Sequence, residues 1–185
     1  MQLEELSQEI WERKYKAPQD STIEDTWRRV AKAVASVEKD QKIWEHNFYR
    51  ILEDFKFIPG GRITNGAGTK NNYLLNCASV PIFDAIAGEN SIARTAERVA
   101  YMSKCNYGCG INFDPIRPKG FPISVGGFAS GVVSFMKVFD TWTSVIQDGG
   151  GRRAALIGLL PIHHVDIFDF IDAKREEGVL TNFNI

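Results

Sequence analysis

Apolar residues recur at helical spacing through the first part of the chain. Three segments repeat their apolar side chains every three or four positions, which places those side chains on one face of an α-helix. One segment follows Ser21 or Thr22 and carries Glu24 or Asp25 in its first turn, the pattern of a helix N-terminus. We interpret the stripes as packing faces and residues 1–57 as an N-terminal helical region.

The texture changes after Phe57. The stretch FIPGGRITNGAGTKNN is dense in Gly, Pro and Asn and predicts a loop. Beyond it, short apolar runs of strand length alternate with helix-like segments, which is the pattern of parallel βα units. We therefore expect residues 58–185 to be α/β. The strand-like segments are 73–82, a short run within 106–120, 154–162 and 179–185, and the helix-like segments are 84–105, 130–147 and 164–178.

The last strand-like segment has nothing behind it. The sequence stops inside VLTNFNI, with no turn, polar tail or cap. An unpaired apolar strand exposes backbone N–H and C=O groups that can pair with another chain, and domains seldom end on such a strand. We therefore expect the sequence to be part of a longer polypeptide.

Composition argues against several classes of protein. Hydrophobic residues make up 44% of the 185 residues and charged residues 24%, which is typical of a globular protein. The net charge of -1 predicts no nucleic-acid partner and no acidic membrane surface. No apolar run approaches the ~20 residues of a membrane helix, and the charged N-terminus lacks the apolar stretch of a signal peptide. Because the cysteines number three, we expect free thiols in a reducing compartment, the cytoplasm.

The cysteines are the first candidates for chemistry. Cys77 ends an apolar strand after Asn76. Composition alone favours a buried structural cysteine, whereas the Gly-rich turn that follows is the setting of a pocket mouth. Cys105 and Cys109 form a C-x3-C pair, which is too weak a signal to predict zinc, so we expect no metal site. Two adjacent histidines mark a strand-to-helix corner, and we expect His163 to help start the helix.

Two basic loops suggest phosphate or nucleotide binding. Gly149–Gly151 permit backbone conformations closed to other residues, and Arg152 and Arg153 offer fork-shaped donors for phosphate or base edges. A solvated surface loop explains these residues equally well. Arg117 lies in a second basic loop between prolines, and Asp84, expected to open a helix, is suited to bind a sugar hydroxyl or to cap that helix. These residues indicate a nucleotide- or phosphate-handling α/β domain.

The order of the motifs extends this interpretation. The blocks FIPGGRI, LLNCASVPI, GCGINFDPIRPKG, ASGVVSFMKVFDTWTSVIQDGGGRRAA and HVDIFDFIDAKREEGVLTNFNI follow one another along the chain. In this order they resemble the N-terminal part of a ribonucleotide reductase catalytic chain, and their residues are most similar to those of the adenosylcobalamin-dependent class, class II. The resemblance implies an N-terminal helical region followed by the first part of a ten-stranded α/β barrel. It also implies an oxidoreductase that replaces the ribose 2′-hydroxyl with hydrogen by thiyl-radical chemistry, for DNA synthesis.

The resemblance assigns a substrate side to the chain. Cys77 matches the cysteine beneath the substrate that gives electrons and becomes half of a disulfide. Asn76 and Gly108 match positions that contact the substrate. The thiyl cysteine, its Asn and Glu partners, the second redox cysteine and a later phosphate loop all belong beyond residue 185. We therefore expect the chain alone to be inactive.

The resemblance also assigns an effector side. Asp84 and Arg117 match positions that hold the sugar and phosphates of a dNTP or ATP effector. Residues 118–128 match a companion loop, in which Ser124 stands where some members carry a basic phosphate ligand. The flexible loop that links the effector to the substrate base matches Gln147–Ala155. Its predicted specificity residues are Gln147, Gly149, Gly150, Gly151, Arg152 and Arg153.

The resemblance implies a set of partners. They are the C-terminal portion of the reductase, which holds most of the adenosylcobalamin site, a ribonucleotide substrate, a dNTP effector, a thioredoxin-type reductant and, in a homodimer, a second copy. Two alternatives stay open. One is a class I large subunit, whose radical comes from a separate subunit. The other is a stand-alone nucleotide-binding regulatory module.

Overall fold

The computed structural model describes residues 3–105, 107–146, 155–175 and 178–185. They form two compact units, Met1–Leu75 and Asn76–Ile185. The sequence placed the boundary earlier, after Phe57. Residues 58–75 belong with the helices instead, because a buried arginine of the first unit binds their backbone.

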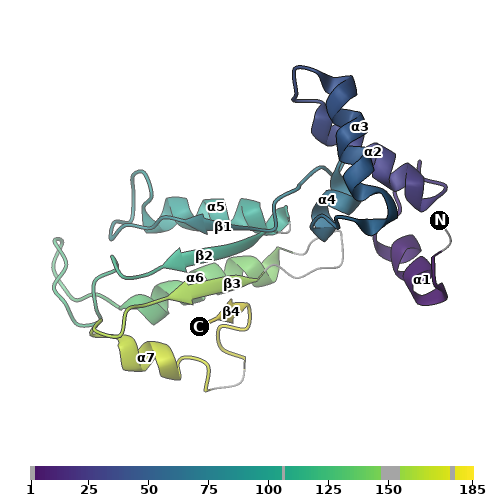
Figure 1. The fold of residues 1–185 in the computed structure, drawn as a ribbon. Coiled ribbons are helices and arrows are strands. Elements are labelled where there is room, and N and C mark those ends of the chain that lie inside the picture. The colour runs from purple at the N-terminus through teal and green to yellow at the C-terminus, as the bar shows by residue number, and fades with distance from the viewer. Residues whose placement is uncertain (1–2, 106, 147–154, 176–177) are drawn as a thin grey trace. The chain divides into compact units, whose positions relative to one another are not determined.

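The first unit is all helical (Figure 1). Its elements are α1 (Glu5–Lys14), α2 (Ile23–Ala35), α3 (Gln41–Leu52), a 3-10 turn η1 (Glu53–Phe55) and α4 (Gly61–Gly66). Helix α2 begins at a capping box: the Thr22 side chain accepts from the Asp25 N–H, and the Asp25 carboxylate accepts from the Thr22 N–H at 2.9 Å. The expected helix start is therefore confirmed. A core containing Trp11, Trp27 and Leu52 joins the first three helices.

Two expectations for this unit were wrong. The Gly-rich stretch is not all loop, since α4 lies within it. Local composition missed this helix because its carbonyl groups are held from α2, where Arg29 donates to the carbonyl of Thr64 at 2.9 Å and to that of Ala67. The apolar stripe of α3 is also only partly a packing face, because Ile43 and Ile51 are exposed.

Arg29 is the centre of a buried polar cluster. The side chains of Arg29 and Asp20 are only 7% and 1% exposed, and Arg29 Nη2 lies 2.9 Å from Asp20 Oδ2. Asp20 also accepts from the Thr26 hydroxyl at 2.7 Å. Burial opposes ionisation of Asp20, but hydrogen bonds from Arg29 and Thr26 outweigh it and hold the pKa of Asp20 below its usual value.

Arg29→Met should destabilise the first unit by about 3–5 kcal/mol, because it leaves the Asp20 charge buried without its partner. Arg13→Met, which breaks an exposed ion pair with Glu9, should cost about 0.5 kcal/mol or less. The measurement is the free energy of unfolding in urea, followed by tryptophan fluorescence. The wild-type contribution of Asp20 should be complete above its ordinary pKa of 3.8 and be lost as the pH falls through the lower folded-state value. Equal losses in the two variants would contradict the buried pair.

The second unit is a parallel α/β sheet. Its strands β1 (Cys77–Val80), β2 (Gly108–Asn112), β3 (Leu156–Leu159) and β4 (Phe183–Asn184) lie in chain order, and each pairs in parallel with the next. Helices α5 (Ile92–Lys104), α6 (Val132–Val145) and α7 (Ile167–Asp172) connect them (Figure 1). The expected parallel βα units are confirmed.

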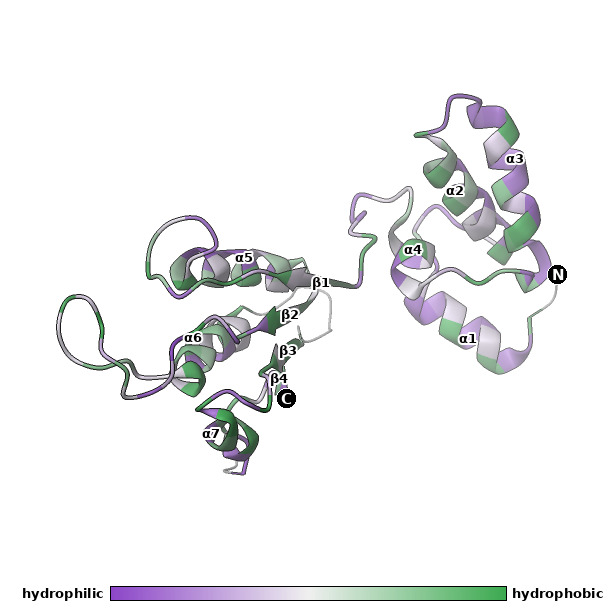
Figure 2. Ribbon diagram, turned by 60° about the vertical axis from the view of Figure 1, so that its left-hand side comes forward, coloured by the Kyte–Doolittle hydropathy of each residue, from purple (hydrophilic) through white to green (hydrophobic). Residues whose placement is uncertain are grey.

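The sheet is packed on one face. Strand side chains that alternate toward α5 and α6 build the core, among them Val80, Ile111 and Leu156, and Phe139 of α6 packs with them. Figure 2 shows hydrophobic residues, in green, along these helices and strands. The other face is open in the described residues. Strand β3 shows this most clearly, since Ile157 and Leu159 are 48% and 56% exposed while Leu156 is fully buried. No helix among the described ranges is long and apolar enough to cross a membrane.

Several boundaries differ from the expected ones. Helix α5 begins at Ile92, and its cap is Ser91, whose hydroxyl accepts from the Arg94 N–H at 3.2 Å. Asp84 therefore neither opens nor caps a helix, because a turn with positive φ at Gly88 and Asn90 separates the two. Helix α7 ends at Asp172 and not at Gly178, and β4 is a two-residue strand.

Candidate functional site

Cys77 lies at the start of β1, on the open face of the sheet. It pairs in register with Gly108, whose N–H donates to the Asn76 carbonyl at 2.9 Å. A Cβ on Gly108 would lie 3.1 Å from Cys77 Sγ and 3.5 Å from the Ala155 carbonyl oxygen. Glycine at this position leaves the sulfur uncovered, and Cys77 is exposed. The predicted substrate residues Asn76, Cys77 and Gly108 are thus adjacent.

The other two thiols are enclosed. Cys105 and Cys109 are buried, and Cys109 Sγ lies 3.8 Å from Met102 Sδ on the helix side of the sheet. Burial, and to a smaller extent the nearby Cys77, raises the pKa of Cys109 to about 11. The thiolate is the reactive form of cysteine, so Cys109 is unreactive at neutral pH. The described part of the chain gathers no three His, Cys, Asp or Glu side chains in a metal-binding arrangement.

A second group of residues lies where β1 and β2 end. Arg117 Nε donates to Asp84 Oδ2 at 2.5 Å, and Arg117 Nη1 donates to the Pro122 carbonyl at 2.8 Å. The structure thus joins two predicted effector residues from different loops. Both side chains are partly exposed, so the pair is open to a ligand.

Residues 118–130 form a hairpin-like loop that we call the hairpin. Pro122 and Phe128 make an antiparallel bridge, and the Ala129 N–H donates to the Phe121 carbonyl at 2.7 Å. Ser124 is exposed near its tip. Among the described residues, no hydrogen bond joins Ser124 to the Asp84–Arg117 pair.

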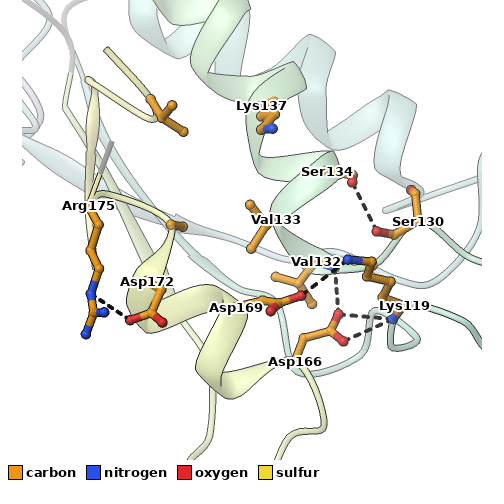
Figure 3. A pocket seen from close by; sticks show the side chains of 13 residues that line it. Lys119, Ser130, Val132, Val133, Ser134, Lys137, Asp166, Asp169, Asp172 and Arg175 are labelled. Atoms are coloured by element: carbon orange, nitrogen blue, oxygen red, sulfur yellow. Dashed lines mark hydrogen bonds and ion pairs between the residues drawn. The ribbon is translucent and has the colours of Figure 1, made fainter. Parts of the chain in front are cut away.

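A hollow of about 500 Å³ beside the hairpin contains a buried acid that the sequence did not reveal (Figure 3). The Asp166 carboxylate accepts from the Lys119 N–H at 3.0 Å and from the Val132 N–H at 3.0 Å. The Asp166 N–H in turn donates to His164 Nδ1 at 3.1 Å, and His164 Nε2 lies 3.0 Å from the Ile116 carbonyl oxygen. His164, and not His163, is thus the corner histidine with a structural role. His164 and Asp166, polar residues within the apolar run LPIHHVDIF, were the available signal.

The two predicted sites lie at opposite ends of the strands, and an edge of the sheet means here the row of strand beginnings or the row of strand ends. Because the strands are parallel, Cys77 and Gly108 mark the edge where strands begin, while Asp84 and Arg117 follow strands that have ended. Ala155 belongs to the first edge, since its carbonyl accepts from the Cys109 N–H at 3.0 Å. The predicted specificity residues Gln147, Gly149, Gly150, Gly151, Arg152 and Arg153 lie outside the described residues.

Comparison with known proteins gives two matches that together cover nearly the whole chain. A family model described as the ribonucleotide reductase all-alpha domain matches residues 1–72, and one described as the ribonucleotide reductase barrel domain matches residues 75–185.

Individual relatives agree with these matches. A vitamin B12-dependent ribonucleoside-diphosphate reductase of Thermoplasma acidophilum is 36% identical over 90% of this chain and 22% of its own length. One of Mycobacterium tuberculosis is 34% identical over 91% of this chain and 25% of its own length. A ribonucleoside-diphosphate reductase subunit alpha of Chlamydia muridarum is 28% identical over 82% of the chain and 14% of its own length. The chain thus spans a quarter or less of these relatives.

Proposed function

We propose the following function for a chain that belongs to the ribonucleotide reductase family, whose all-alpha and barrel domains it matches. Within the complete enzyme, it supplies Cys77 as one of two thiols that reduce a ribonucleotide to a 2′-deoxyribonucleotide in the cytoplasm. The observation that carries the proposal is the position of Cys77. It is the exposed thiol of the three, on an open sheet face, beside a glycine that leaves its sulfur uncovered.

The reaction needs two thiols. Replacing the 2′-hydroxyl with hydrogen consumes two electrons and two protons and releases water. Two cysteines supply both by giving up their hydrogens and joining as a disulfide, so a ribonucleotide and two thiols become a deoxyribonucleotide, a disulfide and water. Neither Cys105 nor Cys109 is suited to be the partner of Cys77, because both are buried. The second redox thiol and the radical cysteine therefore belong to the rest of the enzyme, and a thioredoxin-type reductant restores the pair.

The residues around Cys77 suit a ribose. Asn76, Ser79 and Gly108 are small or uncharged and lie on or beside the open face, so a sugar can approach the sulfur. As the family resemblance implies, we assign adenosylcobalamin binding mainly to the rest of the enzyme. When bound there, the cofactor supplies the radical. The names of the B12-dependent relatives favour this source, and those of the diphosphate reductases favour a ribonucleoside diphosphate substrate.

We further assign the Asp84–Arg117 pair to an effector nucleotide. The guanidinium of Arg117 suits phosphate, and the carboxylate of Asp84 suits a sugar hydroxyl. Within one chain, this pair and the segment ending at Ala155 lie at opposite edges of the sheet. We propose that a second copy, packed along α6, connects the two. Exposed apolar side chains on α6, including Val138, Trp142 and Val145, support such a homodimer.

The experiment compares residues 1–185 with the complete enzyme. Each is incubated with adenosylcobalamin, a dithiol reductant and the four ribonucleoside diphosphates, and deoxynucleotides are measured by chromatography. The complete enzyme should form them, and residues 1–185 should form none, because the radical cysteine is missing. Deoxynucleotide from residues 1–185 alone would place the catalytic residues inside this chain and contradict the proposal. Activity of the complete enzyme only with an added radical-generating subunit would favour the class I alternative. Tight dNTP binding by residues 1–185 alone would favour the regulatory module.

A further inference from the structure

Asp166 joins the two ends of the hairpin. Its carboxylate binds the N–H of Lys119, where the hairpin begins, and the N–H of Val132, where α6 begins (Figure 3). We propose that Asp166 is a positioning residue that fixes the hairpin, and through it Arg117, in the conformation that binds the effector. This inference rests on the effector site proposed above.

The contact is buried and tightly packed. Asp166 is only 6% exposed, and hydrogen bonds to an ionised carboxylate are stronger than neutral ones where water is excluded. Gly131 has φ +84, and a Cβ there would lie 2.6 Å from Asp166 Oδ2 and 2.8 Å from Lys119 Cβ. The hairpin, the start of α6 and the turn after β3 therefore meet with no space for a side chain.

The carboxylate also occupies the N-terminus of α6. An N–H of the first turn points at Asp166, where a negative charge is favourable to the helix dipole. A ligand anion would have to displace this side chain. The hollow beside it is therefore better explained as the surround of a structural contact than as a phosphate site.

His164 holds the same segment from the other side. Its Nδ1 accepts from the Asp166 N–H, and Nε2 is left to donate to the Ile116 carbonyl. The turn after β3 thus fixes the backbone at residues 116, 119 and 132. Arg117 lies between the first two of these points, and its guanidinium reaches the Pro122 carbonyl inside the hairpin. Releasing residue 119 would let Arg117 and the hairpin leave the binding conformation together.

The test uses the complete enzyme with Asp166→Asn, which keeps the shape but removes the charge. Apparent affinity falls in proportion to the fraction of protein in the competent conformation, so we expect the dNTP dissociation constant to rise about tenfold. Turnover without effector should be unchanged, because the contact lies at the sheet edge away from Cys77. The amides of residues 119–132 should exchange faster with deuterated water before any effector is added. The control is Asp169→Asn, which alters an exposed acid of the same hollow, 3.7 Å from Lys119 Nζ, and should change none of these values.

The outcomes separate the effector site from the contact of Asp166 with Lys119 and Val132, which we call the clamp. If Asp166→Asn binds dNTP as wild type does and its hairpin amides stay protected, the clamp is overturned. If wild type binds no dNTP, the effector site fails, and the amide exchange still decides the clamp. If Asp166→Asn does not fold, Gly131→Ala decides, since it crowds the same contact and leaves the carboxylate intact. Wild-type affinity and exchange in that variant would overturn the inference.

Discussion

Cys77→Ser in the complete enzyme is expected to abolish multiple turnover with a dithiol reductant. The change replaces one sulfur with oxygen and removes a thiol that the reaction consumes. Turnover is therefore lost because the reductant itself is missing, and not because a step becomes slower. Nucleotide affinity should stay within about twofold of the wild-type value, since serine is nearly the same size as cysteine and the position is exposed. The measurement is deoxynucleotide formed per enzyme over many cycles, with substrate binding measured separately.

Cys109→Ala is the matched control for this prediction. Cys109 lies on the neighbouring strand but faces the helices, and its pKa of about 11 keeps it a protonated thiol. Its loss should leave turnover close to that of wild type, at the cost of some stability from a small cavity. Full turnover in Cys77→Ser, or complete loss of turnover in a folded Cys109→Ala, would contradict the assignment of the redox role to Cys77 on the open face of the sheet.

Arg117→Ala should weaken effector binding whichever base the dNTP carries. Charge-assisted hydrogen bonds contribute about 1.5–3 kcal/mol, so the dissociation constant should rise about 10- to 150-fold. Arg152→Ala and Arg153→Ala should instead reduce the preference of each effector for its substrate, and they should change effector affinity less than Arg117→Ala does. The measurement is dNTP binding with and without substrate, together with product ratios from mixed ribonucleotides.

Linkage makes this second prediction strict. Coupling between two sites is reciprocal in binding free energy, so a loop variant that loses discrimination must also lose the effect of substrate on dNTP affinity. Trp142→Glu, placed on the exposed face of α6, should lose discrimination by breaking the proposed homodimer. Normal dNTP binding by Arg117→Ala, or full discrimination in the loop variants, would leave these arginines as solvated loop residues.

Sequence was most informative where the cause of a structure is local. The helix start after Ser21 or Thr22 and the alternation of strands and helices depend on neighbouring residues, and both were predicted correctly. The structure selects Thr22 as the cap and adds the reciprocal bond from Asp25. The motif order also predicted the family, which the matches to both domain models confirm. Helix α4 was missed because Arg29 stabilises it from a distant segment.

The candidate sites show the same limit. Cys77 was recognisable from its motif, but its exposure follows from the pairing with Gly108 on another strand. Asp84 was expected to begin a helix, whereas its partner is Arg117 from the next loop. The contacts of Asp166 with Lys119 and Val132 join residues far apart in the chain, and nothing in the spacing predicts them. Contacts of this kind depend on the arrangement of the whole sheet.

The most direct test of the redox role is to map the disulfide after one turnover. The reduced complete enzyme is given ribonucleotide without external reductant, the remaining thiols are alkylated in acid, and the peptides are identified by mass spectrometry. We expect the Cys77 peptide to be recovered in a disulfide with a peptide from beyond residue 185, in an amount equal to the deoxynucleotide formed. Cys105 and Cys109 should be recovered as alkylated thiols. Deoxynucleotide formed while Cys77 remains a free thiol would contradict the account.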